Sequence, residues 1–427
     1  MILALTAVVF VALLALSLPI VFALGVAGVV GLLLGHFPLQ MVASSMIGGS
    51  QNWVLLAIPS FVFAGSLMER CGMSTALVEL ARAMVGWLRG GLGMSVIVVS
   101  YFFSDICGSK MAEVSALGSA LMPPLRRAGY RAEDAASLIA AGTAMGMLVP
   151  PAIFMIVIAA VTNTSAVALF LAGFIPAATV GLCLCLLVLI QAHILGWPKD
   201  TRPSWRNLLR ALREAAVPLV VPVVILGGFY LGAFTATEAG AVVALYSLLA
   251  AKLYYHNVSW RQIAGIAYES GVMTASVVFL LAVATIFQYL MGVTGVPALL
   301  GQALAPLEGT HWLFLLGVAV MTMLFGMVLE GLPAAVVLIP VVFPIATRMG
   351  INPIHFDIVQ TAAVGIGLFL PPMGVGLLMA LRFADVGVFQ HARYYWPYLA
   401  ALGVGLLLII CIPELSLFLP RSAGFVR

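Results

Sequence analysis

Long apolar runs separated by short polar segments dominate the chain from end to end. The first run covers residues 1–35 and is broken only at Ser17-Leu18-Pro19. A single helix of that length would reach ~50 Å, well beyond the ~30 Å hydrocarbon core of a bilayer. Two membrane spans, 2–17 and 19–35, therefore fit better, with Pro19 opening the second. The run lacks a basic segment at its start, so we interpret it as a first span and not as a cleaved signal peptide.

The remaining apolar runs predict further membrane helices and two amphipathic ones. The expected single spans are 51–69, 171–195, 215–233, 236–251, 262–291 and 396–419, and the amphipathic stretches are 74–89 and 296–309. Two further regions, 94–125 and 311–345, have polar or glycine-rich centres, which are typical of re-entrant hairpins. Two others, 134–160 and 355–381, are interrupted by the pairs Pro150-Pro151 and Pro371-Pro372, so we expect broken helices there.

The two halves of the chain resemble each other. A shift of 221 residues superposes helix-breaking and turn residues in register: Pro123 on Pro344, Arg127 on Arg348, Gly129 on Gly350, Gly146 on Gly367, Pro150-Pro151 on Pro371-Pro372 and Pro176 on Pro397. We therefore predict an internal repeat, with a first unit at 1–195 and a second at 215–427. Residues 196–214 form a basic linker between them.

Lysine and arginine set the expected orientation, because they concentrate in the cytoplasmic loops of membrane proteins. Three spans, a broken span and a final span per half give five crossings before the linker, which is then cytoplasmic, while both termini are periplasmic. Of 19 basic residues, 15 fall inside, three fall outside and Lys110 falls within a hairpin. An odd number of crossings inverts the second half, the arrangement of many secondary transporters. Double spans at 94–125 and 311–345 would give the same orientation.

Composition narrows the class of protein further. Hydrophobic residues make up 63% of the chain and charged residues only 8%, against about 25% charged in average soluble domains. This excludes a soluble enzyme, a nucleic-acid binder and a disordered scaffold. The five cysteines form no CxxC pair, which leaves no support for a disulfide framework or a zinc site. No HExxH, GxSxG or Walker sequence is present, so neither an intramembrane enzyme nor an ATP-driven pump is supported.

The interrupted helices supply the candidate chemistry. Non-helical backbone at membrane depth is tolerated where protein or a water-filled cavity covers it. Helix N-termini attract carboxylates, and helix C-termini with unwound carbonyls coordinate Na⁺. The residues expected to form Na⁺ sites are small or oxygen-bearing: Ser104, Gly108, Ser109, Gly142 and Thr143 at one site, and Gly326, Glu330, Gly331 and Gly367 at its inverted counterpart. For each glycine taken singly, helix packing is the competing explanation.

Three ionisable residues stand out in the first hairpin: Asp105, Lys110 and Glu113. Ionisable groups at membrane depth are costly and point to function, here substrate binding or ion coupling. A structural Asp105–Lys110 or Lys110–Glu113 ion pair is the alternative. Glu330 occupies the matching acidic position of the second hairpin, where it could cap a helix N-terminus. Arg382 is expected to reach the cytoplasmic interface rather than substrate.

Several segments together resemble a known family, the large membrane subunit (DctM type) of tripartite ATP-independent periplasmic (TRAP) transporters. The segments are LAIPSFVFAG at 56–65, GGLG at 90–93, GTAMG at 142–146 with the Pro-Pro pair after it, FTATEAGA at 234–241, GINPIHF at 350–356, and residues 367–372. The similarity covers nearly the whole chain in order and spacing. Departures lie at Cys107-Gly108-Ser109-Lys110, where the family has SGS and a small residue, and at Leu370, where it often has threonine.

The resemblance implies an all-α, elevator-type secondary transporter in a bacterial inner membrane. It also implies a small four-span membrane partner, a periplasmic substrate-binding protein and Na⁺-driven uptake of an organic acid, with no other metal and no nucleic acid. Both departures fall where the family places Na⁺ and substrate. A stand-alone Na⁺/carboxylate symporter of the same architecture remains an alternative. An ion channel is another, although paired hairpins favour occluded sites.

Overall fold

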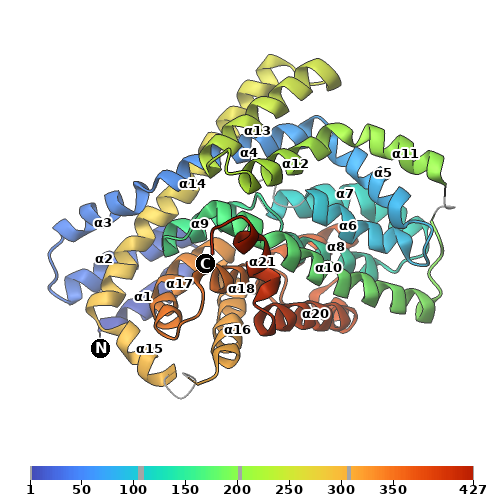
Figure 1. The fold of residues 1–427 in the computed structure, drawn as a ribbon. Helices are drawn as coiled ribbons and strands as arrows, with labels where there is room; N and C mark the ends of the chain where they lie inside the picture. The colour runs from blue at the N-terminus through green and yellow to red at the C-terminus, as the bar shows by residue number, and fades with distance from the viewer. Residues whose placement is uncertain (1, 104–109, 201–203, 305–308, 427) are drawn as a thin grey trace.

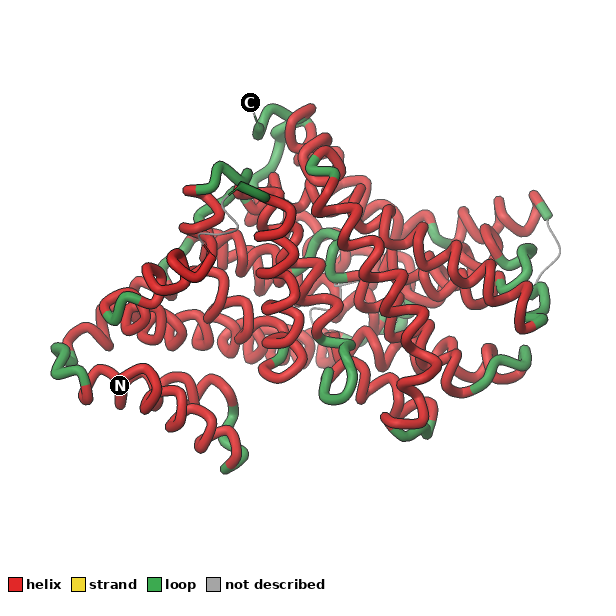
Figure 2. Tube along the Cα trace, turned by 90° about the horizontal axis from the view of Figure 1, so that it is seen from below, coloured by secondary structure: helices red, strands yellow, loops and turns green. Residues whose placement is uncertain are grey.

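The computed structural model describes residues 2–103, 110–200, 204–304 and 309–426. These residues form helices joined by turns and loops (Figure 1). Within those ranges the one pairing of β type is an isolated bridge between Arg89 and Lys199. The expected all-α class is therefore confirmed. Figure 2 shows the helices near the N-terminus on one flank of the molecule.

Among the described residues up to 214, the chain forms eleven α-helices and one 3-10 turn. They are α1 (Ile2–Ala15), α2 (Ile20–Leu34), α3 (Gln40–Ser50), η1 (Trp53–Leu56), α4 (Ala57–Arg70), α5 (Met73–Val85), α6 (Gly91–Phe103), α7 (Lys110–Arg127), α8 (Ala132–Gly146), α9 (Ile153–Thr162), α10 (Ala166–Leu195) and α11 (Trp205–Glu214). The break expected around Ser17-Leu18-Pro19 is present between α1 and α2.

A second series of helices covers the rest of the described residues. It comprises α12 (Ala216–Tyr230), α13 (Ala236–Ala250), the π-turn η2 (Ala251–Tyr255), α14 (Trp260–Val293), α15 (Val296–Leu304), α16 (His311–Leu329), α17 (Gly331–Arg348), α18 (Pro353–Gly367), α19 (Val375–Ala384), α20 (Val388–Cys411) and α21 (Glu414–Ser422). Local chemistry starts several of these helices. Thr235 with Glu238, and Ser259 with Gln262, form capping boxes at α13 and α14, each satisfying otherwise unpaired backbone N–H groups.

Length and composition make the chain a multi-span membrane protein. Seven helices in the described ranges can cross a bilayer, or eight if α11 and α12, bent by 68°, count as one span. Because α12 alone covers the predicted span 215–233, the bend separates it from the amphipathic α11. Trp205 and Leu209 on α11 are largely exposed, as expected of a helix that lies at a membrane surface.

Two predictions from the sequence need correction. No element was expected between residues 35 and 51, yet α3 forms there and contacts α14, where Thr285 donates a hydrogen bond to the Ser45 carbonyl at 2.7 Å. Gly49 makes this approach possible, because a Cβ there would lie 2.7 Å from Thr285 Cγ2. The final span at 396–419 is also wrong. The helix runs from Val388 to Cys411 and α21 follows, because Pro413 has no N–H to continue it.

The two Pro-Pro-interrupted helices lie side by side at the centre. Every residue of α8 from Asp134 to Gly146 and of α18 from Ile354 to Gly367 is buried. Their backbones nearly touch, since a Cβ on Gly365 would lie 2.6 Å from the Ala144 carbonyl oxygen. Each half contributes to the other: α7 contacts α19, and α17 contacts α9. These reciprocal contacts are what a repeat of two equivalent units predicts. The inverted relation of the two units stays a prediction.

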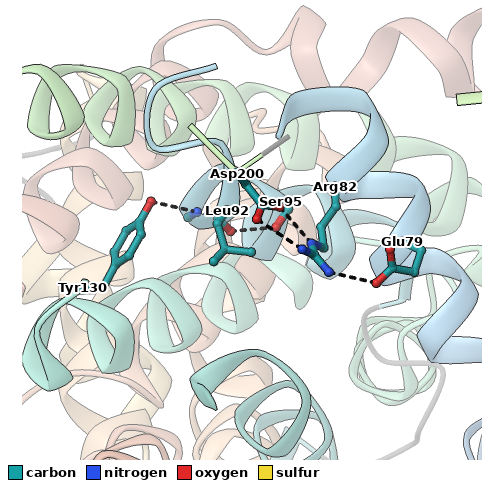
Figure 3. Close-up of polar contacts among 7 residues, drawn as sticks. Glu79, Arg82, Leu92, Ser95, Tyr130 and Asp200 are labelled. Atoms are coloured by element: carbon teal, nitrogen blue, oxygen red, sulfur yellow. Dashed lines mark hydrogen bonds and ion pairs between the residues drawn. The ribbon is translucent and has the colours of Figure 1, made fainter. Parts of the chain in front are cut away.

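Segments predicted to be cytoplasmic contact one another around Arg82 and Asp200, near Tyr130 (Figure 3). Arg82 on α5 binds Asp200 of the linker through two hydrogen bonds, 2.9 and 3.1 Å long, and the hydrogen bond raises the pKa of Arg82. Tyr130, from the α7–α8 turn, accepts a hydrogen bond from the Gly93 N–H at 3.3 Å. These contacts place the segments on one side of the protein, as the charge distribution requires.

Candidate functional site

A cavity of about 200 Å³ lies where the starts of α7 and α17 meet the breaks that follow α8 and α18. By the ~30 Å³ share of liquid volume per water, it has room for roughly seven water molecules, and so for a small solute. Its lining residues are Lys110, Met111, Met147, Ile153, Phe154, Met273, Glu330, Gly331, Leu332 and Leu368. The structure thus brings Lys110, Glu330 and Gly331, predicted from distant parts of the sequence, to one site.

Six helix ends border this cavity. Lys110, Ile153 and Gly331 are the first residues of α7, α9 and α17. Met147, Glu330 and Leu368 directly follow the last residues of α8, α16 and α18. Helix N-termini carry positive partial charge and C-termini negative partial charge. The site therefore offers N–H groups to an anion and carbonyl oxygens to a cation within one small volume.

Local sequence explains why the helices end here. Pro150-Pro151 and Pro371-Pro372 are joined by cis peptide bonds, and each pair begins four residues after the last residue of α8 or α18. Proline cannot donate the helical hydrogen bond, and it disfavours helical geometry in the residue before it. Between α16 and α17 the chain reverses at Glu330, whose φ of 67° and ψ of 165° are rare for a residue with a side chain.

Lys110 forms a buried ion pair with Glu113. The Lys110 Nζ lies 2.8 Å from Glu113 Oε2, and their side chains are 8% and 1% exposed. A lysine at a helix N-terminus interacts unfavourably with the helix dipole, and a glutamate in the first turn interacts favourably. Glu113 therefore offsets the charge of Lys110 through the ion pair and also offsets its unfavourable interaction with the dipole. One of the two expected ion pairs is therefore confirmed. The other involves Asp105, which lies outside the described residues.

The other predicted Na⁺ residues are placed as follows. Ser104, Gly108 and Ser109 lie outside the described residues. On α8, the Thr143 hydroxyl donates to the Ile139 carbonyl at 2.8 Å, and a Cβ on Gly142 would lie 2.9 Å from Ser100 Oγ. Neither residue is among those that line the cavity. Gly367 allows α16 and α18 to approach, whereas a Cβ on Gly326 would lie at an ordinary 3.8 Å from Gly367 Cα. The role of both glycines as ion ligands stays a prediction.

Two expectations about single side chains can be compared with the structure. Glu330 occupies the N-cap position of α17 but its side chain makes no capping hydrogen bond, so that prediction is wrong. The backbone at Glu330 points this side chain elsewhere, and it contributes to the cavity wall. Arg382 is exposed in the last turn of α19, which agrees with a position away from the cavity.

Sequence reasoning missed two groups of polar residues around the broken helix α18. Asp357 accepts hydrogen bonds from Thr162 and Thr164, and Gln360 accepts one from Thr322 on α16. An aspartate within the apolar run 355–381 was the available signal, since ionisable groups at membrane depth are rare. Within the described ranges, no group of three His, Cys, Asp or Glu residues could hold a metal ion.

The close crossing of α16 and α18 predicts a specific effect on stability. A Cβ on Gly367 would lie 2.6 Å from the Met323 carbonyl oxygen and 3.0 Å from Met323 Cα, so Gly367→Ala forces two backbones apart. We expect a loss of about 1–3 kcal/mol, measured as a lower apparent melting temperature of the purified protein. Gly403→Ala in α20 is the matched control, because nothing lies within 4 Å of its Cβ position. Equal melting temperatures for the two variants would contradict the crossing.

Comparison with known proteins gives consistent matches over almost the whole chain. Residues 7–415 match the family described as "Tripartite ATP-independent periplasmic transporter, DctM component". The chain is 34% identical to the C4-dicarboxylate TRAP transporter large permease protein DctM of Pseudomonas aeruginosa, covering 94% of each chain. It is 32% identical to the sialic acid TRAP transporter large permease protein SiaM of Vibrio cholerae, covering 90% of each. It is also 32% identical to the 2,3-diketo-L-gulonate TRAP transporter large permease protein YiaN of Escherichia coli, covering 94% of this chain and 95% of the relative.

Proposed function

This chain belongs to the DctM component family of tripartite ATP-independent periplasmic transporters, and we propose that it carries a small organic acid across a bacterial inner membrane with Na⁺ as coupling ion. It is a membrane transport protein, a large permease subunit, and not an enzyme. The observation that carries the proposal is the cavity bordered by three helix N-termini and by Lys110. The relatives are named for C4-dicarboxylate, sialic acid and 2,3-diketo-L-gulonate, all of them acids.

The geometry suggests how the two solutes divide the site. A substrate carboxylate would take the N–H groups at the starts of α7, α9 and α17, where anions are favoured. Na⁺ would take carbonyl oxygens at the ends of α8, α16 and α18, together with the predicted ligands of the first hairpin. Na⁺ bound beside the carboxylate would offset part of the substrate's negative charge while the loaded site moves through the membrane. An elevator-like movement of the central helices relative to the rest is part of the proposal.

The partners we propose follow from the tripartite family. A small four-span membrane subunit would assemble with this chain, and a periplasmic substrate-binding protein would deliver the acid to it. The test is uptake of a labelled C4-dicarboxylate into proteoliposomes containing both membrane subunits and the binding protein, with and without a Na⁺ gradient. Uptake by this chain alone would favour a stand-alone symporter, and flux that does not saturate would favour a channel.

The orientation predicts which cysteines a membrane-impermeant thiol reagent can reach in intact cells. Cys411 is exposed at the end of α20, the predicted periplasmic side, and Trp205, at the start of α11, is 80% exposed on the predicted cytoplasmic side. In a variant that keeps Cys411 as its single cysteine, we expect labelling in intact cells. In a variant whose single cysteine is Trp205→Cys, we expect labelling only after the cells are opened. The reverse pattern would overturn the topology.

A further inference from the structure

The helix α18 carries a buried acid that the proposed transport site does not use. The Asp357 side chain is fully buried. Its Oδ2 accepts hydrogen bonds from the Thr162 hydroxyl at 2.9 Å and the Thr164 hydroxyl at 2.7 Å. Thr162 is the last residue of α9, and Thr164 follows Asn163, which ends that helix with a φ of 56°. The acid therefore ties the second broken helix to the end of the first.

The second carboxyl oxygen of Asp357 has no partner. Oδ1 is buried and makes no hydrogen bond. Among the ion pairs of the described residues none includes Asp357, so no Lys, Arg or His nitrogen lies within 4.0 Å of it. An ionised carboxylate without a counter-charge is strongly disfavoured in an apolar interior. The group must therefore be neutralised by a proton or a bound cation.

Counting hydrogens favours the proton. The Thr162 hydroxyl oxygen also lies 2.9 Å from the Ile158 carbonyl oxygen and 2.9 Å from the Thr164 hydroxyl oxygen. With the two contacts to Asp357, there are four short oxygen–oxygen contacts. The two threonine hydroxyls supply only two hydrogens for them. A proton on the Asp357 carboxyl adds a third donor and removes the charge. It can come from water when this end of the helices is exposed, and return there.

Helix packing itself does not require an acid at this position. The 221-residue shift between the two halves places Ala136 of α8 opposite Asp357 of α18. Both residues are fully buried, so an equally buried position of the matching helix holds an alanine. The carboxyl group is therefore an addition to the fold, and its cost in burial calls for a ligand.

The other ionisable groups on the elements that contact α18 form no ion pair with Asp357, and two of them, Asp134 on α8 and Tyr395 on α20, also have a buried oxygen without a hydrogen-bond partner. His355 on α18 contacts Ser416 at 2.7 Å, and His391 on α20 contacts Ser137 at 2.8 Å. Glu133 on α8 accepts from Gln390, and Glu414 on α21 pairs with Arg421. His193, His311, Arg348 and Arg393 are exposed. Asp134 on α8 is buried but is itself a carboxyl group, so it offers no positive charge to Asp357.

We propose that Asp357, together with Thr162 and Thr164, is a proton-binding site, occupied while these helices are packed together. Where the chain transports as proposed above, this gives uptake a dependence on protons besides that on Na⁺. The site itself does not rest on transport. It requires only that the carboxyl is protonated in the folded protein, which can be measured without substrate or partners.

Infrared spectroscopy of the purified chain in lipid at neutral pH tests the site directly, because a protonated carboxylic acid has its own carbonyl-stretch band. We expect Asp357→Asn to lose one such band, and Glu238→Gln, which alters an exposed carboxylate, to lose none. If Asp357→Asn leaves the bands unchanged, the group is ionised and the proposal fails. If Na⁺ alone removes the band from the unaltered protein, a cation displaces the proton and the site is not proton-specific, which also overturns it.

A second variant keeps the test decisive should Asp357→Asn fail to fold. Thr164→Val keeps the shape of the side chain but removes the donor that lies 2.7 Å from Oδ2. We expect the same band to shift, because the carboxyl loses a hydrogen-bond partner, and to remain present. A band that neither shifts nor disappears in Thr164→Val would contradict the assignment to Asp357. In proteoliposomes with a fixed Na⁺ gradient, the pH dependence of uptake should be lost in Asp357→Asn.

Discussion

Gly331→Val is expected to abolish uptake while leaving folding and assembly with the partner subunit intact. Gly331 opens α17 and lines the cavity. A Cβ there would lie 2.7 Å from Val364 Cγ1 and 3.2 Å from Leu368 Cδ1. These contacts are to side-chain atoms and not to backbone, so the protein should fold. The isopropyl group of valine, however, either displaces the end of α18 or occupies a cavity of only about 200 Å³.

The expected loss is at least about 100-fold in uptake rate, equivalent to about 2.7 kcal/mol, measured in proteoliposomes. Gly331→Ala adds one methyl group and should cause a smaller loss. Gly317→Val is the matched control on the neighbouring helix α16, because its Cβ position has open space. The sequence predicts the same loss for Gly108→Val in the first hairpin. Normal uptake by Gly331→Val, with size-exclusion profiles equal to those of the control, would remove the cavity from the mechanism.

Most of the helical architecture could be predicted because hydrophobic runs and helix breakers act locally. Pro19 separates α1 from α2, and the two Pro-Pro pairs interrupt the central helices where the sequence places them. Each of these residues removes a backbone donor and restricts its neighbour, whatever surrounds it. The convergence of Lys110 and Gly331 also followed from the expectation that hairpin tips meet at depth.

The missed elements depend on contacts between distant residues. The helix α3 contains serine and glycine and has a weak helical signal, but Thr285 of α14 binds it across 240 residues of sequence. The last helices divide at Pro413, where an apolar pattern alone predicts continuity. Tertiary packing thus overrides the weak helical preference of α3. At Pro413, the missing backbone N–H ends a helix that the apolar pattern would continue.

The candidate site divides in the same way. Glycines at helix ends were predicted as ion ligands, yet Gly142 and Gly367 face Ser100 and Met323 across tight helix contacts. Sequence gives the size of a residue but not which neighbour needs it to be small. Asp357 was missed because its partner Thr162 lies 195 residues away. Such a pair becomes visible only once the two broken helices are placed side by side.

The second large effect concerns Lys110 and distinguishes two roles for its charge. The ammonium is a fixed monovalent cation, so it can stand in for one Na⁺ among the carbonyl oxygens of the helix ends. It can also hold a substrate carboxylate in the cavity that it lines. Removing Lys110 alone breaks its buried ion pair with Glu113, and removing one partner of a buried pair destabilises a protein by about 3–5 kcal/mol. The informative comparison is therefore between Lys110→Met and the double variant Lys110→Met with Glu113→Gln, in which both charges of this pair are removed together.

Uptake by both variants, measured against a Na⁺ titration, separates the roles. If Lys110 replaces a sodium ion, the double variant should need more Na⁺ and respond to it more steeply, because a vacant cation site has been added. If Lys110 holds the substrate, the apparent affinity should fall about tenfold to 100-fold at every Na⁺ concentration, as expected for loss of a charged hydrogen bond of about 1.5–3 kcal/mol. If Na⁺ dependence and affinity both match the unaltered protein in the double variant, while Lys110→Met alone is unstable, the pair is structural and neither role stands.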